Sequence, residues 1–499
     1  MFLLATLPPD PVIVASGAVD PDLLRRTIRG AYHVHTTRSD GSADRAAVAA
    51  AAARAGLQFI IFTDHGDGTR HVPAAEYLSG VLCLDGVEVS TNGGHYVALD
   101  MPAAPYPLGG DAAAVVEDVA RLGGFGIAAH PDHPRAELAW RDWSAPIDGI
   151  EWLNLDSQWR DEGALRLMRV PFDYMLRPGG TIASLLDRPV SALNAWDALE
   201  RSRPVVGLAA VDAHGGGRRN GEGRAAKLGI GPGYEASFRT ISNSVLLPRP
   251  LDGNAPADGR LVLDAIRQGS VYSVVDAIAT GAVLGRRDED AAFEPATAMP
   301  DGTRVDVIEQ EGRRRLELLT PRAPGEPAVP WVITNWTGPR RIAPVPPLPA
   351  PLVTGPIELS SPWRVEKDSA SSGQVFVEDD LVTLHYTLDE GRRSQFVALA
   401  ADVVQGRSFD VLAFIARAVK PMRLSVQLRF EDGARWVKSV YLDSQERDIA
   451  VRVADMTPDV RSGAAVPEPV TASSILFVVD LVNARPGDSG SFTIRDLRR

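Results

Sequence analysis

Short apolar runs alternate with helix-favouring segments between residues 31 and 275. The predicted strands are 31–35, 58–62, 81–84, 95–99, 125–129, 148–154, 205–211 and 270–274, and the predicted helices are 43–56, 111–124, 191–200 and 259–269. Ser42 is the expected N-cap of the first helix, and Gly56 its expected end. Repeated βα units of this size favour a parallel sheet, either closed into a barrel or doubly wound.

After about residue 280 the hydrophobic pattern changes to a period of two. The segments 303–308, 314–319, 422–430 and 438–442 alternate polar and apolar residues, as half-buried antiparallel strands do. The stretch 343–356 contains six prolines and is expected to be a linker. We therefore predict an N-terminal extension (1–27), a βα domain (28–280), a small β unit (281–342), a proline-rich linker (343–357) and a β-sandwich (358–499).

Composition limits the classes of partner. The formal charge of -12 opposes binding to duplex nucleic acid, and no apolar run approaches the roughly 18 residues that cross a membrane. Cys83 is the one cysteine, so no internal disulfide can form, and its run VLCL favours a buried thiol. The N-terminus lacks a basic region and resembles an export signal poorly. A cytoplasmic location is therefore favoured, while export stays open because a truncated signal would look similar.

The histidines are concentrated in the βα region. Eight of the nine fall between residues 33 and 214, and His33 and His35 are expected on one face of a strand. Nearly all members of a set of nine polar residues lie at or just past the C-terminal end of a predicted strand. The set consists of His33, His35, Asp40, His65, Glu88, His95, His130, Asp212 and His214. In a βα barrel these ends converge on one mouth.

This set of residue types points to metal binding. A single histidine is more often an ordinary core or surface residue, and an isolated HxH is weak evidence. Nine polar groups that are desolvated together need partners, and divalent cations bind imidazole and carboxylate directly. Mixed ligands of this kind suit manganese, iron or zinc better than magnesium or calcium.

The motifs HVHTTRSDG, FTDHGDG, GVEVSTNGGHYVAL, GIAAHPDHP and GLAAVDAHGG resemble the successive motifs of the PHP (polymerase and histidinol phosphatase) superfamily of metal-dependent phosphoesterases. The resemblance implies a distorted seven-stranded βα (TIM-like) barrel with three metal ions. It implies a first metal at His33, His35, Glu88 and Asp212, and a second at Glu88, His95 and His130. The third would be held by Asp40, His65 and His214.

Two further resemblances concern the β regions. VPWVITN (329–335), which closes the small, Ig-like β unit, is similar to the carbaryl-hydrolase-like (CehA/McbA) branch of PHP metallohydrolases. That branch implies carboxyl esters or carbamates as further substrates. WRVEKDS, RWVKSVYLD and FVVDLVN in the C-terminal region resemble a galactose-binding-like jelly roll of the carbohydrate-binding type.

The expected function is hydrolysis of a small phosphate ester by a metal-bridging hydroxide, with Glu88, Asp212 and His214 as catalytic residues. One alternative is a carboxyl-ester or carbamate hydrolase with the same metals. Another is a glycan-binding or scaffold protein with a vestigial barrel, which exposed Trp363 and Trp436 on one sandwich face would support.

Several polar residues near the predicted mouth are candidates for other roles. Arg38, Arg70, His133 and Arg218 are candidate substrate contacts, although each is also compatible with a solvated loop. Asp64 is a candidate to orient His65. Glu151 is either a group at the mouth or an outward carboxylate.

Overall fold

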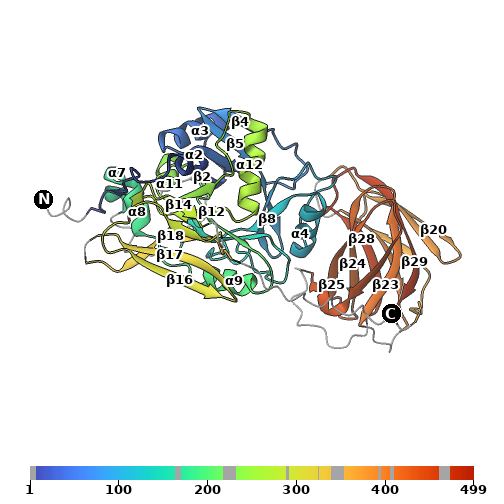
Figure 1. Cartoon of the computed structure of the whole chain (residues 1–499). Helices are drawn as coiled ribbons and strands as arrows, with labels where there is room; N and C mark the ends of the chain where they lie inside the picture. The colour runs from blue at the N-terminus through green and yellow to red at the C-terminus, as the bar shows by residue number, and fades with distance from the viewer. Residues whose placement is uncertain are drawn as a thin grey trace. The chain divides into compact units, whose positions relative to one another are not determined.

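The computed structural model describes residues 7–162, 170–216, 232–287, 291–323, 325–338, 353, 355–391, 395–404, 410–459 and 472–499. The chain divides into two units (Figure 1). Unit 1 comprises residues 1–103 and 116–345, and unit 2 comprises residues 104–115 and 346–499. Most of the predicted proline-rich linker lies outside the described residues.

Two open sheets form the centre of unit 1. In order across the nine-stranded sheet the strands are β16 (Arg304–Gln310), β17 (Arg313–Pro321), β18 (Ala328–Thr334), β12 (Val271–Val274), β11 (Ser242–Leu246), β2 (Thr27–Val34), β3 (Phe59–Phe62), β5 (Val81–Asp85) and β4 (Glu76–Leu78). The five-stranded sheet runs β10 (Val206–Ala210), β9 (Gly149–Asn154), β8 (Phe125–Ala128), β7 (Gly94–Leu99) and β6 (Val87–Thr91).

Smaller elements complete the described part of unit 1. The strands β1 (Val12–Ile13) and β13 (Ala279–Thr280) pair, as do β14 (Leu284–Arg286) and β15 (Phe293–Pro295). The helices are α2 (Pro21–Arg26), α3 (Arg45–Arg54), α4 (Ala112–Arg121, which begins in the segment belonging to unit 2), α5 (Leu155–Arg160), α7 (Val170–Leu176), α8 (Pro178–Ser184), α9 (Val190–Glu200), α11 (Tyr234–Phe238) and α12 (Ala255–Arg267).

The predicted closed βα barrel is wrong. β2, β3 and β5 are parallel, as are β8, β9 and β10, but β7 is antiparallel to both β6 and β8, and β11 is antiparallel to both β2 and β12. Single bridges, Val34 to Ala213 and His65 to Glu88, link the two sheets. Among the described residues no continuous ladder closes a barrel.

The fold class expected for residues 281–342 is also corrected. β18 pairs antiparallel with β12, with Tyr272 opposite Thr334 and Val274 opposite Val332. The hairpin strands β16 and β17 follow β18 in the same sheet. This segment therefore extends the nine-stranded sheet of unit 1 and does not form a separate Ig-like unit.

A shared apolar core holds the sheets of unit 1 together. Ile61 and Leu84 from the nine-stranded sheet belong to one buried cluster with Val97, Ile127 and Leu208 from the five-stranded sheet. Burial of such side chains stabilises a fold by about 1.5–3 kcal/mol each. The core fixes the strand ends, and the candidate site lies at those ends.

Helix α3 begins two residues later than the sequence suggested. Asp44, and not Ser42, is the N-cap, because its Oδ1 atom accepts a hydrogen bond from the backbone N–H of Ala47 at 2.8 Å. The hydroxyl of Ser42 donates instead to the carbonyl oxygen of Gly215. The predicted stop at Gly56 agrees with the structure, where this glycine has φ 77°.

Unit 2 is a β-sandwich, as predicted. One sheet runs β19 (Arg364–Lys367), β22 (Phe396–Asp402), β28 (Ser474–Asp480), β24 (Met422–Arg429), β25 (Arg435–Leu442) and β27 (Thr457–Pro458). The other runs β20 (Ser372–Glu378), β21 (Leu381–Thr387), β29 (Ser489–Arg498), β23 (Val411–Ala418) and β26 (Arg447–Arg452), and a 3₁₀ turn (Val453–Asp455) follows β26. Leu399, Phe477, Leu412 and Phe414 are fully buried in a core that draws on both sheets.

Trp363 and Trp436 are the two tryptophans whose exposure would support a glycan-binding face on unit 2. Trp436 is buried in the sandwich core, and Trp363 packs against that core with its ring centroid 6.0 Å from that of Phe477. Neither tryptophan therefore forms an exposed platform for a glycan.

No helix among the described residues is long and apolar enough to span a membrane.

Candidate metal centre

The structure brings together all nine residues that the strand ends suggested. They come from β2 and the loop after it (His33, His35, Asp40), from the segments after β3, β8 and β10 (His65, His130, Asp212, His214), and from β6 and β7 (Glu88, His95). Most are buried, while the side chains of Asp40, His65 and His214 are partly exposed. The two single bridges between the sheets lie at this cluster.

Glu88 lies at the centre of the cluster. Its Oε2 atom is 3.2 Å from His33 Nε2, 3.2 Å from His35 Nε2 and 3.1 Å from His65 Nδ1, and its Oε1 atom is 2.6 Å from His95 Nδ1 and 2.9 Å from His130 Nε2. Five imidazoles thus face the two oxygen atoms of one carboxylate that is 1% exposed. Such an arrangement concentrates nitrogen and oxygen donors around one point.

Asp212 completes a second group with the paired histidines. Its Oδ1 atom lies 3.5 Å from His33 Nε2 and 3.3 Å from His35 Nε2, and those two nitrogen atoms are 3.1 Å apart. A β-bulge in the pairing of β2 with β3 falls at His33. The bulge re-aims the His33 side chain, so the two rings meet at their Nε2 atoms.

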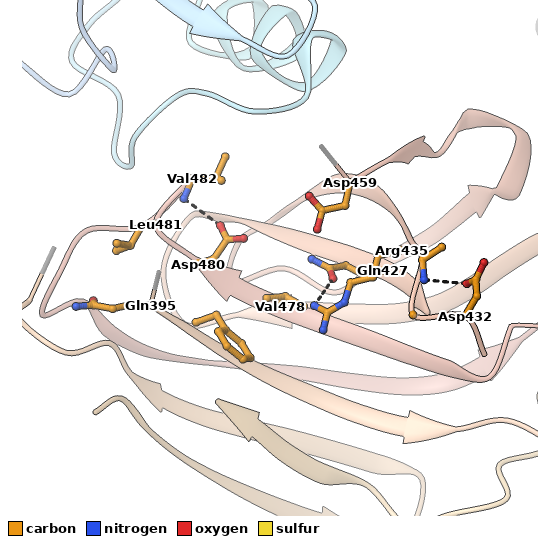
Figure 2. Close-up of a pocket in the computed structure, with 12 residues that line it drawn as sticks. Gln395, Gln427, Asp432, Arg435, Asp459, Val478, Asp480, Leu481 and Val482 are labelled. Atoms are coloured by element: carbon orange, nitrogen blue, oxygen red, sulfur yellow. Dashed lines mark hydrogen bonds between the residues drawn. The ribbon is translucent and has the colours of Figure 1, made fainter. Parts of the chain in front are cut away.

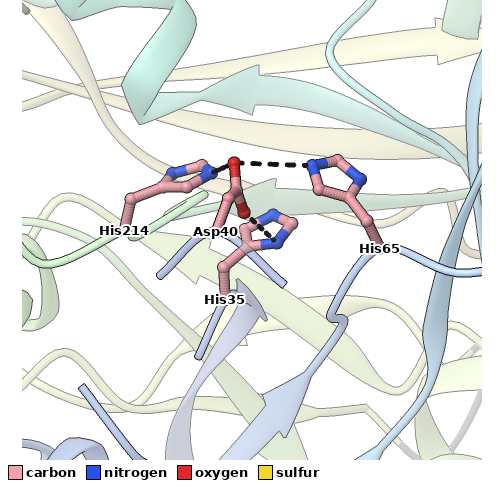
Figure 3. A group of neighbouring side chains, drawn as sticks. All are labelled: His35, Asp40, His65 and His214. Carbon is pink, nitrogen blue, oxygen red and sulfur yellow. Dashed lines mark ion pairs between the residues drawn. The ribbon is translucent and has the colours of Figure 1, made fainter. Parts of the chain in front are cut away.

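Asp40 lies among three histidines at the more exposed side of the cluster (Figure 3). Its Oδ2 atom is 3.2 Å from His214 Nε2 and 3.8 Å from His65 Nε2, and its Oδ1 atom is 3.4 Å from His35 Nδ1. The rings of His35 and His214 are stacked with centroids 4.3 Å apart. His65 contacts Glu88 through Nδ1 and approaches Asp40 through Nε2, so it lies between two groups of donors.

Electrostatics favours ionised carboxylates in this cluster. Burial by itself would raise the pKa of Glu88, but the imidazoles of His33, His130 and His35 outweigh it and hold that pKa well below its usual range. Burial also disfavours a charged His33, yet the carboxylates of Asp212, Glu151 and Glu88 hold its pKa well above the usual value. The carboxylates are therefore ionised, and their charge is neutralised either by protonated imidazoles or by a bound cation.

The residues fit divalent metal ions. Among the described residues, four overlapping sets have donor atoms within 4.8 Å of one another: His35, Asp40, His65 and His214; His33, Glu88 and His130; His33, His35 and Asp212; and His65, Glu88 and His95. Within the part of the chain that the structure describes, His130 Nδ1 is buried without a hydrogen-bond partner. Imidazole and carboxylate donors at such spacing are the ligands that zinc, manganese and iron prefer.

The loop after β2 is held by Asp64. The carboxylate of this residue accepts hydrogen bonds of 2.7 Å from the backbone N–H of Thr36, the hydroxyl of Thr36 and the hydroxyl of Ser39. Asp64 therefore supports the loop that carries His35 and Asp40, where sequence suggested that it orients His65. Gly41 makes this loop possible, because a Cβ atom there would lie 2.5 Å from the carbonyl oxygen of His35.

The candidate substrate contacts have different positions. Arg38 forms an ion pair with Asp85 at 3.1 Å, and Arg70 is exposed. His133 is buried with its ring centroid 5.4 Å from that of His130, and burial lowers its pKa to about 4. Arg218 lies outside the described residues.

Sequence reasoning overlooked Arg160, a basic residue near the cluster. It ends α5, the short helix that follows β9, and pairs with Asp156. Burial lowers the pKa of Arg160, but Asp156 and, beyond it, Asp212 and Asp40 outweigh this effect and raise it. The position of α5 directly after a strand end was the available signal.

Glu151, whose orientation the sequence left open, points into the cluster. It lies in β9, is fully buried, and its Oε1 atom is 2.5 Å from His33 Nδ1. Three candidate ligands have positive φ angles: His33 at 67°, His130 at 30° and Asp212 at 44°. Such backbone costs about 1–3 kcal/mol per residue and persists where surrounding contacts impose it.

Comparisons with known proteins give little guidance. No family model and no curated protein matches the chain. Among solved structures, it is similar to a family 11 carbohydrate-binding module from Clostridium thermocellum in complex with a β-1,3-1,4-mixed-linked tetrasaccharide (14% identity, 27% of this chain, 86% of that chain, TM-score 0.23). It is also similar to TmCBM61 in complex with β-1,4-galactotriose (18% identity, 28% and 88%, TM-score 0.18). These values are too low to transfer a ligand or a function.

Proposed function

We propose that unit 1 is a metal-dependent hydrolase of small esters, with a phosphate ester as the leading substrate class. The observation that carries this proposal is the position of Glu88, whose two oxygen atoms face five imidazoles within 3.2 Å. A structural core rarely buries so many polar groups together without an ion, because each desolvated group needs a partner.

Three sets of side chains would hold the ions. His33, His35, Glu88 and Asp212 form the first, and Glu88 with His95 and His130 forms the second. Asp40 and His214 form the third, with His65 or His35. Divalent ions in such sites supply Lewis acidity and activate water near neutral pH. The ordered motifs that resemble those of PHP metallohydrolases support the same assignment.

Two basic or neutral donors near the cluster suit an anionic oxygen of the substrate. The guanidinium of Arg160 has a planar fork that matches phosphate or carboxylate, although Asp156 already accepts from its Nε atom. The low pKa of His133 leaves its imidazole neutral near pH 7, so it can donate or accept a hydrogen bond without adding charge. Arg38 is engaged in a similar way by Asp85.

The experiment is a metal count followed by a substrate comparison. Purified protein, reconstituted with Mn²⁺ or Zn²⁺, is tested by elemental analysis and then assayed with p-nitrophenyl phosphate, p-nitrophenyl acetate and 1-naphthyl N-methylcarbamate. We expect close to three ions per chain and turnover of the phosphate ester. Preferential turnover of the acetate or the carbamate would show that the protein is a hydrolase of a different class of ester. Protein that binds no metal would overturn the proposal.

A second candidate function, binding of a neutral saccharide by unit 2, is favoured by one pocket. The pocket has a volume of about 790 Å³ and is lined by Gln395, Phe396, Gln427, Arg435, Asp459 and Asp480 among others (Figure 2). Gln395 is 4% exposed, and its buried Oε1 atom has no hydrogen-bond partner among the described residues. Amide, carboxylate and guanidinium groups beside an aromatic ring suit a ligand rich in hydroxyl groups.

The charges that line the pocket favour a neutral ligand, and a titration tests whether a saccharide binds there. Asp432, Asp459 and Asp480 outnumber Arg435 in the lining, which disfavours an anionic ligand. Calorimetric titration with a mixed-linked β-glucan tetrasaccharide and with galactotriose should give binding that Gln395→Ala removes. The control is Gln374→Ala, an exposed residue of the other sheet. Equal binding by both variants, or none by the wild type, would exclude this pocket as the site for these saccharides.

A further inference from the structure

Glu151 contacts the candidate metal centre from behind the ligands, without belonging to any of the donor sets described above. Its Oε1 atom lies 2.5 Å from His33 Nδ1, and its Oε2 atom accepts hydrogen bonds from the backbone N–H of His130 at 2.7 Å and from Asn154 Nδ2 at 2.9 Å. One buried carboxylate thus receives three hydrogen-bond donors. Two of them belong to candidate ligands.

Asn154 extends this network to a third ligand. Its Nδ2 amide also lies 3.2 Å from Asp212 Oδ2, and its Oδ1 atom accepts a hydrogen bond of 2.9 Å from the backbone N–H of Ser157. The Ser157 N–H can donate only to an oxygen, so it fixes which end of the Asn154 amide faces Glu151 and Asp212. The orientation of Asn154 is therefore determined by the first turn of α5.

The three ligands that this pair contacts are also the ones with unusual backbone. Nine non-glycine residues of the described chain have positive φ, and His33, His130 and Asp212 are the buried ones among them. The other six, Ser79, Asp100, Ala291, Glu311, Asp379 and Asp496, lie outside the cluster. Each of these three strained ligands is hydrogen-bonded to Glu151 or Asn154. This coincidence indicates that the two residues impose the geometry of the ligands.

We propose that Glu151, oriented by Asn154, is the positioning residue of the metal centre and selects the ligand form of His33. A carboxylate next to Nδ1 keeps a proton on that atom, so a metal ion near Glu88 and Asp212 would displace the other proton and bind through Nε2. The hydrogen bond to the His130 N–H holds a second ligand in its strained conformation. This inference rests on the proposed metal-dependent function and adds the residues that organise the site.

The sharpest variant is Glu151→Gln, which keeps the shape of the side chain. Glu151 accepts from three donors with two oxygen atoms, whereas glutamine has one oxygen and an NH₂ group. Whichever way the amide turns, its NH₂ group faces either His33 Nδ1 or the His130 N–H and Asn154. Asn154→Ser is the second variant, because serine still caps α5 but lacks the amide that reaches Glu151 and Asp212.

The measurement is metal affinity, not turnover. Zn²⁺ affinity is determined by competition with a chromophoric chelator on the full-length protein, and circular dichroism checks the fold. We expect both variants to bind Zn²⁺ about 10- to 100-fold more weakly than the wild type. Glu137→Gln, an exposed residue of the same type with its side chain 68% accessible, is the matched control and should leave the affinity unchanged.

A spectroscopic signature separates positioning from a structural role. In the Zn²⁺-loaded protein with ¹⁵N-labelled histidine, the wild-type His33 should show the Nδ1–H tautomer, and Glu151→Gln should alter that signal. Folded variants with wild-type Zn²⁺ affinity and an unchanged His33 signal would overturn the inference while leaving the metal centre intact. If Glu151→Gln does not fold, Asn154→Ser decides. A wild-type protein that binds neither Zn²⁺ nor Mn²⁺ overturns the proposed function and this inference with it.

Discussion

Asn335 and Gly207 exchange two hydrogen bonds across unit 1. The backbone N–H of Gly207 donates to Asn335 Oδ1 at 2.7 Å, and Asn335 Nδ2 donates to the carbonyl oxygen of Gly207 at 2.9 Å. The same amide also donates to the carbonyl oxygen of Val271. A single side chain beyond β18 thus joins β10 of the five-stranded sheet to β12 of the nine-stranded sheet.

We predict that Asn335→Ala destabilises unit 1 by about 2–4 kcal/mol. The variant leaves the buried N–H of Gly207 without its acceptor, which costs about 1–3 kcal/mol, and removes one donor from each of two carbonyl groups, which costs less because a carbonyl oxygen has two lone pairs. Chemical unfolding followed by tryptophan fluorescence measures the change. Glu309→Gln on the exposed side of β16 is the control and should change the free energy of unfolding by less than about 0.5 kcal/mol. Equal stabilities would mean that β10 and β12 do not depend on this contact.

Most elements of unit 1 could be predicted from hydrophobic runs, yet their pairing could not. The strand predicted at 58–62 is β3, and that at 148–154 is β9. The parallel barrel failed because β6 and β11 were not recognised as antiparallel strands. Asn92 and Gly93, which lie between β6 and β7, are a strong hairpin signal. β11, with the sequence SNSVL, is fully buried despite its polar residues, so its hydrophobic pattern is weak.

Cys83 should react slowly with thiol reagents in the native protein. Burial raises the pKa of its thiol to about 11, so the thiolate is scarce at pH 8. Because the folded pKa lies above the unfolded one, this residue favours the folded state below about pH 8.5. That contribution is lost as the pH rises toward 11. Labelling with a chromogenic disulfide at pH 8 should be slow in buffer and fast in denaturant, and equal rates would contradict the prediction.

Glu88→Gln should remove bound metal and reduce kcat about a thousandfold or more. The substitution deletes the negative charge that five imidazoles face, and loss of a dominant electrostatic group has effects of about that size. Elemental analysis and turnover of p-nitrophenyl phosphate measure the two effects. His71→Ala, an exposed histidine outside the cluster, should leave both unchanged. Near-native metal content in Glu88→Gln would show that Glu88 is not a ligand of the metal centre.

The candidate site was more predictable than the fold around it. Residues at strand ends converge whether the sheet is open or closed, so His130 and Asp212 could be placed from the apolar runs before them. Glu151 could not, because every residue of β9 is buried and no alternation marks its facing side. Arg38 was overestimated for a different reason. Its partner Asp85 is 47 residues away in sequence, and no local pattern reveals such a pair.

Asp40→Asn should lower the metal content from about three ions per chain to about two. Asp40 contacts His214, His65 and His35, whereas the groups around Glu88 and Asp212 do not depend on it. Its carboxylate is partly exposed, so the change should be tolerated by the fold. Asp44→Asn is the control, since asparagine caps α3 as well as aspartate does. Retention of three ions, or loss of all of them, would contradict a separate third group.

A protein that ends at residue 342 should fold, bind metal and hydrolyse p-nitrophenyl phosphate with an unchanged kcat. All nine candidate ligands precede residue 215, and β16–β18 with Asn335 are retained. In this truncated protein, residues 104–115 lose the hydrogen bonds that the rest of unit 2 donates to them. One example is the bond from the guanidinium of Arg423 to the carbonyl oxygen of Ala114. That carbonyl can bond to water instead.

The matched comparison is a protein that ends at residue 280. It keeps the same nine residues but loses β16–β18, which leaves the edge of β12 unpaired and Gly207 without Asn335. We expect it to be insoluble or unfolded, since an unpaired strand edge and unsatisfied buried groups both destabilise a sheet. Kinetics, metal content and circular dichroism of both truncated proteins, beside the full chain, measure the difference. If the longer form is soluble and metal-loaded yet inactive, unit 2 contributes directly to catalysis. If the shorter form is fully active, β16–β18 are dispensable for the site.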